Sequence, residues 1–297
     1  MTIAACYVSP EGVVLGADST ASAVLQGAPG ITTFHYFNHN QKVFQIGETG
    51  SLGVVTWGLG GLGNISHRTL IAQLSDDLSA KPAADLLEVG NRWASLFWAS
   101  YSAQIQAPGI DFLTLQQKLP FDPNGNAPNT RTKEEEQRFQ SLSRDLVVGF
   151  CIGGYVLPNR TPGACIVTFD PTLTAPPAPK EIAVHTIQWF GVPNLILRLI
   201  NGCDIQIRET ILNSGKWSGT APDLDALLGQ FRLSHSMLPI RDAINFVYTS
   251  IYSTIKAMKF SSLPQVCGGP IELAVITSDR AFRWVRHKTW DSAIDEG

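Results

Sequence analysis

The sequence has little charge and no concentration of one sign. Charged residues make up 16% of the 297 residues, and the formal net charge is −3. No segment gathers Lys and Arg into the basic stripe that a phosphate backbone attracts, so we expect no nucleic acid partner. Hydrophobic residues make up 44%, which is enough to bury a large core and argues against extensive disorder.

The sequence also lacks cysteine pairs and metal-ligand motifs. It has no C-x-x-C pair, and His35 and His39 lie in an expected loop that does not direct both rings to one face. We therefore expect no metal and no cofactor. The cysteines are odd in number and lie mostly in apolar runs, so we expect buried thiols in a reducing compartment. They are Cys6, Cys151, Cys165, Cys203 and Cys267.

The sequence shows neither the residue pattern of a targeting segment nor that of a membrane span. Residues 1–7 carry no basic region, and the apolar run stops at Ser9 and Pro10. Neither a signal peptide nor a membrane anchor is expected, and the predicted location is cytoplasmic. The chain also has no Walker motif, so any ATP-driven unfolding would have to come from a separate protein.

The alternation of apolar and polar residues predicts strands and helices in alternating groups. Two segments interrupt this pattern and are expected to be surface insertions, near 106–142, with one exposed helix, and near 213–237. Predicted helices cover residues 70–78, 86–101, 195–211 and 240–258. Predicted strands cover residues 2–8, 13–17, 42–46, 52–56, 146–156, 164–169, 181–188, 271–277 and 281–285.

This order of elements predicts one domain over residues 1–297 with an α/β fold. Strands, two helices, strands, two helices and strands follow one another, and each antiparallel sheet needs an apolar partner face. We therefore expect a four-layer αββα sandwich, with two stacked antiparallel sheets and a helix layer outside each. The helix face around Trp93, Phe97 and Trp98 is more apolar than a monomer is expected to cover, which favours a homo-oligomer.

Thr2 can combine a nucleophile and its base in one residue. Its side chain is small, so Met1 is expected to be removable, which would leave a free α-amine beside a hydroxyl. An α-amine has an unperturbed pKa of about 7.7 to 8.0 and can accept the hydroxyl proton near neutral pH. Taken alone, a threonine at position 2 more often reflects tolerance at a flexible chain end.

Asp18 and Lys42 are the charged residues that support a role for Thr2. Asp18 lies sixteen residues after Thr2, at the end of the apolar run Val13 to Ala17. A carboxylate in that position is costly to bury without a partner. The alternatives are a turn or cap aspartate for Asp18 and a solvated lysine at a strand end for Lys42.

The residue patterns and the order of three segments resemble those of the proteasome β-subunit family of N-terminal-nucleophile (Ntn) hydrolases. That family begins with Thr and continues with a hairpin of the form D/E-G-V-V-L-A-A-D, whose aspartate lies sixteen residues after the nucleophile. Residues 11–18, EGVVLGAD, match this pattern. Residues 42–46, KVFQI, match the family's next strand, and residues 53–58, GVVTWG, occupy the place of the small-residue strand that ends in glycine.

The resemblance implies a fold, an activity and a set of roles. The fold would be the Ntn-hydrolase fold, as in a bacterial proteasome-related subunit. Thr2 would be the nucleophile of a threonine peptidase, Lys42 would supply positive charge, Asp18 would orient that lysine, and the Gly58 N–H would stabilise the oxyanion. The substrate would be peptides or unfolded proteins, processed in a homo-oligomeric ring with a possible separate ATP-dependent unfoldase.

Several positions depart from the family pattern. Thr20 stands where many members have arginine, Phe190 replaces a supporting serine, and Pro264 and Cys267 replace a later aspartate and serine. The segment between Asp18 and Lys42 is also longer than in most members. Two alternatives to a ring peptidase therefore stay open: a scaffold or interaction subunit with weak activity, and a small-molecule amidase of the wider superfamily.

Overall fold

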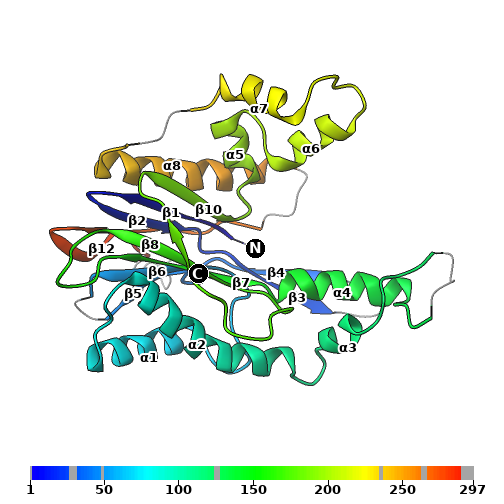
Figure 1. Ribbon diagram of the computed structural model, residues 1–297, viewed down its shortest axis with the longest axis horizontal. Helices are drawn as coiled ribbons and strands as arrows, with labels where there is room; N and C mark the ends of the chain where they lie inside the picture. The colour runs from blue at the N-terminus through cyan, green and yellow to red at the C-terminus, as the bar shows by residue number, and fades with distance from the viewer. Residues whose placement is uncertain are drawn as a thin grey trace.

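Two five-stranded antiparallel sheets stacked face to face form the centre of the molecule, and helices cover the outer face of each (Figure 1). The structure, a computed structural model, describes residues 2–26, 32–47, 50–123, 128–233, 237–261 and 266–288. The layers run helices, sheet, sheet, helices. The predicted αββα sandwich is confirmed.

The first sheet carries the N-terminal strand near its centre. Both β1 and β2 are buried along their whole length, because one face packs against helices and the other against the second sheet. The strand order is β10-β1-β2-β11-β12. These strands are β1 (Ile3–Ser9), β2 (Gly12–Ala17), β10 (Thr186–Gly191), β11 (Glu272–Thr277) and β12 (Arg280–Arg286).

The second sheet has the order β5-β6-β7-β8-β9, and its strands are antiparallel to their neighbours. A shared apolar cluster between the two sheets includes Cys6 and Leu15 from the first sheet and Val55 and Cys151 from the second. The strands are β5 (Val43–Ile46), β6 (Leu52–Gly58), β7 (Val148–Gly154), β8 (Gly163–Phe169) and β9 (Lys180–Ile182).

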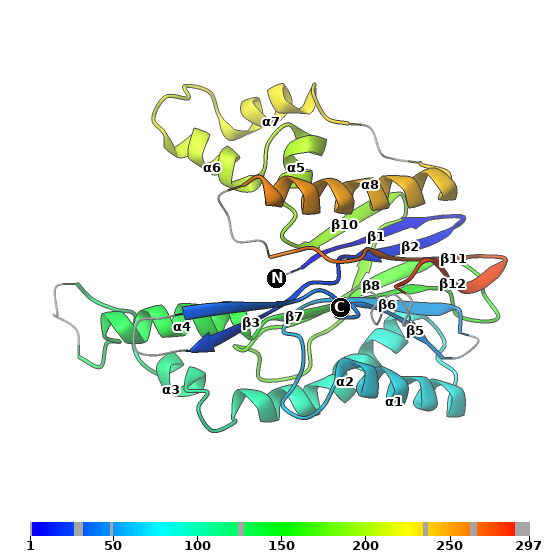
Figure 2. The same cartoon turned by 180° about the vertical axis from the view of Figure 1, so that it is seen from behind.

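Two helix layers complete the sandwich, one on each side of the stacked sheets, as both views show (Figures 1 and 2). Helices α1 (His67–Ala80) and α2 (Leu86–Ile105) cover the second sheet, and α5 (Asn194–Asn201) and α8 (Ile240–Lys259) cover the first. In α2, Trp93 and Phe97 are fully buried against the second sheet. The expectation that a monomer would leave this face uncovered is therefore wrong for these two residues.

The strand predicted over residues 181–188 is wrong, because the structure has two short strands there. Residues 180–182 form β9 at the edge of the second sheet, and residues 186–191 form β10 at the edge of the first. His185 lies between them with a φ of 63°, a left-handed conformation outside the extended range of β-strands. The chain crosses from one sheet to the other at this residue.

The single helix predicted over residues 195–211 is also divided. Helix α5 ends at Asn201 and is capped by Gly202, whose φ is 79°, and α6 (Ile205–Asn213) begins after Asp204. The Asp204 carboxylate accepts a hydrogen bond from the N–H of Ile207 at 2.8 Å and caps the new helix. Glycine in the left-handed conformation is a common helix terminator. The helical spacing of apolar residues therefore continues in the sequence although the helix itself is interrupted.

The two segments predicted to be insertions contain more regular structure than expected. Residues 106–142 contribute α3 (Phe112–Gln116) and α4 (Lys133–Asp145), and residues 213–237 contribute α7 (Ala221–Gly229). No residue of α4 is buried. The long segment after Asp18 forms a hairpin of β3 (Ala21–Gln26) and β4 (Thr32–Phe37), which was not predicted. Within the described ranges, no helix is both long and apolar enough to cross a membrane.

Candidate active site

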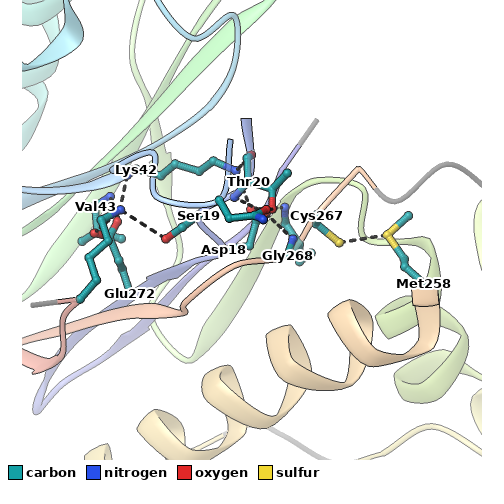
Figure 3. A network of polar contacts seen from close by, with 12 residues as sticks. Asp18, Ser19, Thr20, Lys42, Val43, Met258, Cys267, Gly268 and Glu272 are labelled. Carbon is teal, nitrogen blue, oxygen red and sulfur yellow. Dashed lines mark hydrogen bonds and ion pairs between the residues drawn. The ribbon is translucent and has the colours of Figure 1, made fainter. Parts of the chain in front are cut away.

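Lys42 and Asp18 form a buried ion pair. Lys42 lies just before β5 and Asp18 just after β2, so the pair connects the two sheets at the end where the N-terminal strand begins (Figure 3). Lys42 Nζ is 2.7 Å from Asp18 Oδ1, and the two side chains are 4% and 0% exposed. The alternative of a solvated strand-end lysine is therefore wrong.

Both oxygens of the Asp18 carboxylate have two hydrogen-bond donors. Oδ1 accepts from Lys42 Nζ and from the backbone N–H of Ile3 at 3.1 Å. Oδ2 accepts from the N–H groups of Thr20 at 3.1 Å and Gly268 at 2.9 Å. The bond to the N–H of Thr20, two residues on, is that of a turn aspartate. The alternative role of Asp18 as a turn or cap residue is therefore correct but incomplete. Four donors compensate the lost hydration of the buried carboxylate.

Lys42 is held by two oxygens. Besides Asp18 Oδ1, its Nζ donates to the backbone carbonyl of Thr20 at 2.6 Å. Burial lowers the pKa of Lys42 below its usual range, and the Asp18 carboxylate acts in the opposite direction. Burial likewise raises the pKa of Asp18, and Lys42 opposes that shift. The two groups therefore depend on each other for their charge.

Thr2 is buried in spite of its position, at 4% exposed. Its carbonyl oxygen accepts a hydrogen bond from the N–H of Val192 at 2.8 Å, beside the end of β10. Gly191 makes this approach possible, because a Cβ there would lie 1.8 Å from the same oxygen and its φ is 83°. Thr2 is thus fixed by its neighbours, which contradicts the alternative of a tolerant, flexible end.

Gly58 ends β6 in the opposite sheet. Its φ is 87°, and a Cβ at this position would lie 2.2 Å from the carbonyl oxygen of Val147, so only glycine fits. Its neighbour Trp57 stacks on Phe190, with ring centroids 3.9 Å apart and an interplanar angle of 7°. Phe190 in turn pairs with Ala4 on the N-terminal strand. This stack connects the end of β6 to the strand that follows Thr2.

Glu272 is a buried carboxylate of this region that the sequence interpretation missed. It lies at the start of β11, is 0% exposed, and accepts hydrogen bonds from the N–H groups of Lys42 at 2.9 Å and Val43 at 3.2 Å. Its other oxygen is 3.2 Å from Lys288 Nζ. Glu272 therefore fixes the backbone of Lys42 while Asp18 fixes its side chain (Figure 3).

Two of the residues that depart from the proteasome β-subunit sequence pattern have structural roles of their own. Cys267 is buried, and its Sγ donates to Met258 Sδ at 2.9 Å. Burial raises the pKa of Cys267 to about 12, so the thiol is neutral near pH 7. Its neighbour Gly268 supplies the backbone donor to Asp18. Pro264 lies outside the described residues, so its predicted place is not tested.

The structure thus brings Asp18, Lys42 and the start of β1 together, and it adds Glu272 to them. One sequence signal could have found Glu272. It is a single carboxylate inside the apolar run from Ile271 to Ile276, the same kind of signal that drew attention to Asp18. The catalytic roles of Thr2, Asp18, Lys42 and Gly58 all stay predictions.

Comparisons with known proteins add only a distant structural likeness. No protein-family model matches the chain, and no curated protein sequence matches it. Among solved structures, a Gly-1 mutant of Anbu from Hyphomicrobium sp. strain MC1 is similar. The two are 11% identical, with a TM-score of 0.46 over 97% of this chain and 86% of that one. At these values the likeness does not extend to site residues or activity.

Proposed function

We propose that the chain is a threonine-type peptidase or amidase in which Thr2, freed by removal of Met1, is the nucleophile. One observation carries this proposal: Asp18 Oδ1 accepts from Lys42 Nζ at 2.7 Å and from the N–H of Ile3, the residue after Thr2, at 3.1 Å. A single buried oxygen therefore holds an ammonium group next to the N-terminal strand. Positive charge there favours alkoxide character on a nearby hydroxyl.

The proposed reaction has two steps, both at Thr2. In the first, Oγ bonds to the amide carbonyl carbon, the hydroxyl proton passes to the α-amine, and the carbonyl electron pair moves to oxygen. The C–N bond then breaks, and the proton goes to the leaving amine. In the second step water attacks the resulting ester, releasing the carboxylic acid and restoring the hydroxyl. Gly58 N–H is the proposed donor to the oxyanion.

A scaffold or interaction subunit with weak activity is the second candidate. The observation that favours it is the replacement of supporting groups: Phe190 stacks on Trp57, and the Cys267 thiol is directed to Met258. Neither side chain can act as a hydroxyl donor to the α-amine. A scaffold needs neither Met1 removal nor a reactive Thr2, so the two candidates differ in what they require of the chain's first residues.

The proposed substrate is a peptide or an unfolded protein, and the proposed assembly is a homo-oligomeric ring. Support for assembly comes from large apolar side chains exposed on the outer helix layer, including Leu199 at 56%, Ile205 at 69% and Phe231 at 69%. A separate ATP-dependent unfoldase is a possible partner. Light scattering at micromolar concentration tests the assembly, and a monodisperse monomer would contradict it.

The test of the activity is peptide hydrolysis by wild type, Thr2→Ser and Thr2→Ala, with mass spectrometry to confirm the first residue. Serine keeps the hydroxyl and the amine, so measurable turnover should remain. Alanine removes the nucleophile and should lower the rate by at least ~10³-fold. The wild-type rate should rise with pH as the α-amine loses its proton. Full activity in Thr2→Ala would favour the scaffold or another catalytic site.

A further inference from the structure

A pocket of about 330 Å³ opens beside the Asp18–Lys42 pair. One wall is the segment that leads into β5, a second is the first turn of α1, and a third is the segment after β12. The pocket is lined by Asn40, Phe44, His67, Arg68 and Lys288, among others. Asn40 connects the pocket to the candidate active site, because its N–H donates to the carbonyl of Ser19, next to Asp18, at 2.9 Å.

The cations around this pocket outnumber the carboxylates that compensate them. Lys42 is paired with Asp18, and Lys288 Nζ lies 3.2 Å from Glu272 Oε1. Arg68 is the third cation, and no carboxylate of the described residues lies within ion-pair distance of its guanidinium group. With two carboxylates for three cations, one positive charge is left to attract an anion.

Arg68 is held in place by neutral groups. Its guanidinium group donates to Gln41 Oε1 and lies 5.6 Å from the centroid of the Phe44 ring. These contacts orient the planar group without neutralising it. Arg68 also lies in the first turn of α1, where the helix dipole favours negative charge. A carboxylate in the pocket would meet a guanidinium group already fixed for paired hydrogen bonds.

Two further side chains indicate that this positive charge belongs to a binding site. His67 lines the pocket, is 5% exposed, and its Nε2 has no hydrogen-bond partner. Lys288 is partly buried, and burial lowers its pKa; Glu272 opposes this shift, and repulsion from Lys42 and Arg68 adds to it. An anion between Arg68 and Lys288 would relieve that repulsion.

We propose that this pocket binds a carboxylate, with Arg68 as the principal ligand and Lys288, positioned by Glu272, as the second cation. The inference rests on the proposed function in one respect: it assigns the carboxylate to a peptide and so names acidic peptides as the preferred substrate class. That carboxylate has two possible sources, an acidic side chain and the free C-terminus of a peptide. Phe44 supplies an apolar wall for the methylene groups of either.

The test measures binding without turnover. Full-length Thr2→Ala protein is titrated against three fluorescent, N-acetylated hexapeptides by anisotropy. One has an internal Glu and an amidated C-terminus, the second has Gln in its place, and the third has Gln and a free C-terminal carboxylate. One carboxylate peptide should bind at least about tenfold more tightly than the neutral peptide, as expected for a charge-assisted hydrogen bond. Which of the two does so identifies the source.

Two variants in the Thr2→Ala background separate the pocket from general charge. Arg68→Gln should reduce the preference to less than about threefold, since the shorter amide side chain stays polar but has no charge. Arg241→Gln removes the same charge from the exposed face of α8, in the opposite helix layer, and should leave the preference unchanged.

Equal affinity for all three peptides, no binding of any of them at millimolar concentration, or an unchanged preference in Arg68→Gln would each overturn the inference. Because the readout is binding by a protein without the nucleophile, these outcomes are independent of whether the wild type hydrolyses peptides. Inactivity of the wild type together with a preference that depends on Arg68 would contradict the proposed function alone.

Discussion

The Asp18 carboxylate and the Lys42 ammonium group lie 2.7 Å apart with both side chains buried, and each is the other's charged partner. Removing one partner of a buried pair leaves an uncompensated charge, which costs about 3 to 5 kcal/mol. Asp18→Asn and Lys42→Met should therefore each lower the free energy of unfolding by about that amount. Urea unfolding followed by circular dichroism measures it.

The double variant Asp18→Asn/Lys42→Met is the control for this pair. It leaves no unpaired charge, so its loss of stability should be smaller than the sum of the two single losses. Peptide hydrolysis should nevertheless be absent in all three proteins, because the role proposed for Lys42 needs its charge. Additive losses of stability would show that the two side chains do not interact. Wild-type turnover in Lys42→Met would contradict the proposed site.

His67 makes the stability of the protein depend on pH. Burial lowers the pKa of His67 from 6.5 to about 4, and the ring packs against Phe97 and Phe150. Between these values the unfolded chain binds a proton that the folded chain does not, so stability falls as the pH decreases from about 6.5 to about 4. The contribution of this one group is about 3 kcal/mol.

The matched variant is His67→Phe, which keeps an aromatic ring and does not titrate in this range. Urea unfolding at intervals from pH 7 to pH 4 should show a smaller loss of stability for the variant than for wild type. An identical pH dependence in both proteins would show that His67 is not buried in its neutral form.

The stacked rings of Trp57 and Phe190 join the two sheets beside Gly58. Phe190 is 8% exposed, and truncating a buried Phe costs about 3 to 5 kcal/mol. We expect Phe190→Ala to fall in that range and to change the fluorescence of Trp57, with Phe190→Leu losing less. Equal unfolding midpoints for Phe190→Ala and wild type would show that the stack does not stabilise the sandwich.

Glu272 should matter through its charge. Glu272→Gln keeps an oxygen that can accept from the N–H groups of Lys42 and Val43, but it loses the charge that faces Lys288. We expect a loss of about 1 to 3 kcal/mol in the free energy of unfolding. Glu181→Gln, at an exposed position on β9, is the control and should change it by less than ~0.5 kcal/mol. Equal effects of the two substitutions would contradict this role.

The sequence predicted those helices and strands in which the periodic spacing of apolar residues matches an uninterrupted element. The hairpin of β1 and β2 and the helix α8 are of this kind, because their spacing runs unbroken to their ends. It did not predict the break between β9 and β10, since His185 adopts a positive φ of 63° through its place between two sheets. Histidine is more frequent in that conformation than most residues, but it adopts it too rarely for the local sequence to predict the break.

The candidate site was predictable to the extent that its residues carry charge within apolar surroundings. Asp18 and Lys42 were found in this way, and Glu272 could have been. The donors at Ile3 and Gly268 and the acceptor at Thr20 are backbone groups, and their contacts depend on which strand ends meet in space. A pattern of side chains cannot contain that information.

The most direct test of the central claim is the intact mass of the protein before and after treatment with a β-lactone that acylates reactive hydroxyl groups. Wild type should lack Met1 and gain one acyl group, mapped to Thr2. Thr2→Ala should gain none, and Thr56→Ala, which removes another buried threonine hydroxyl, should be labelled like wild type. A retained Met1, or equal labelling of wild type and Thr2→Ala, would contradict the claim that Thr2 is the nucleophile.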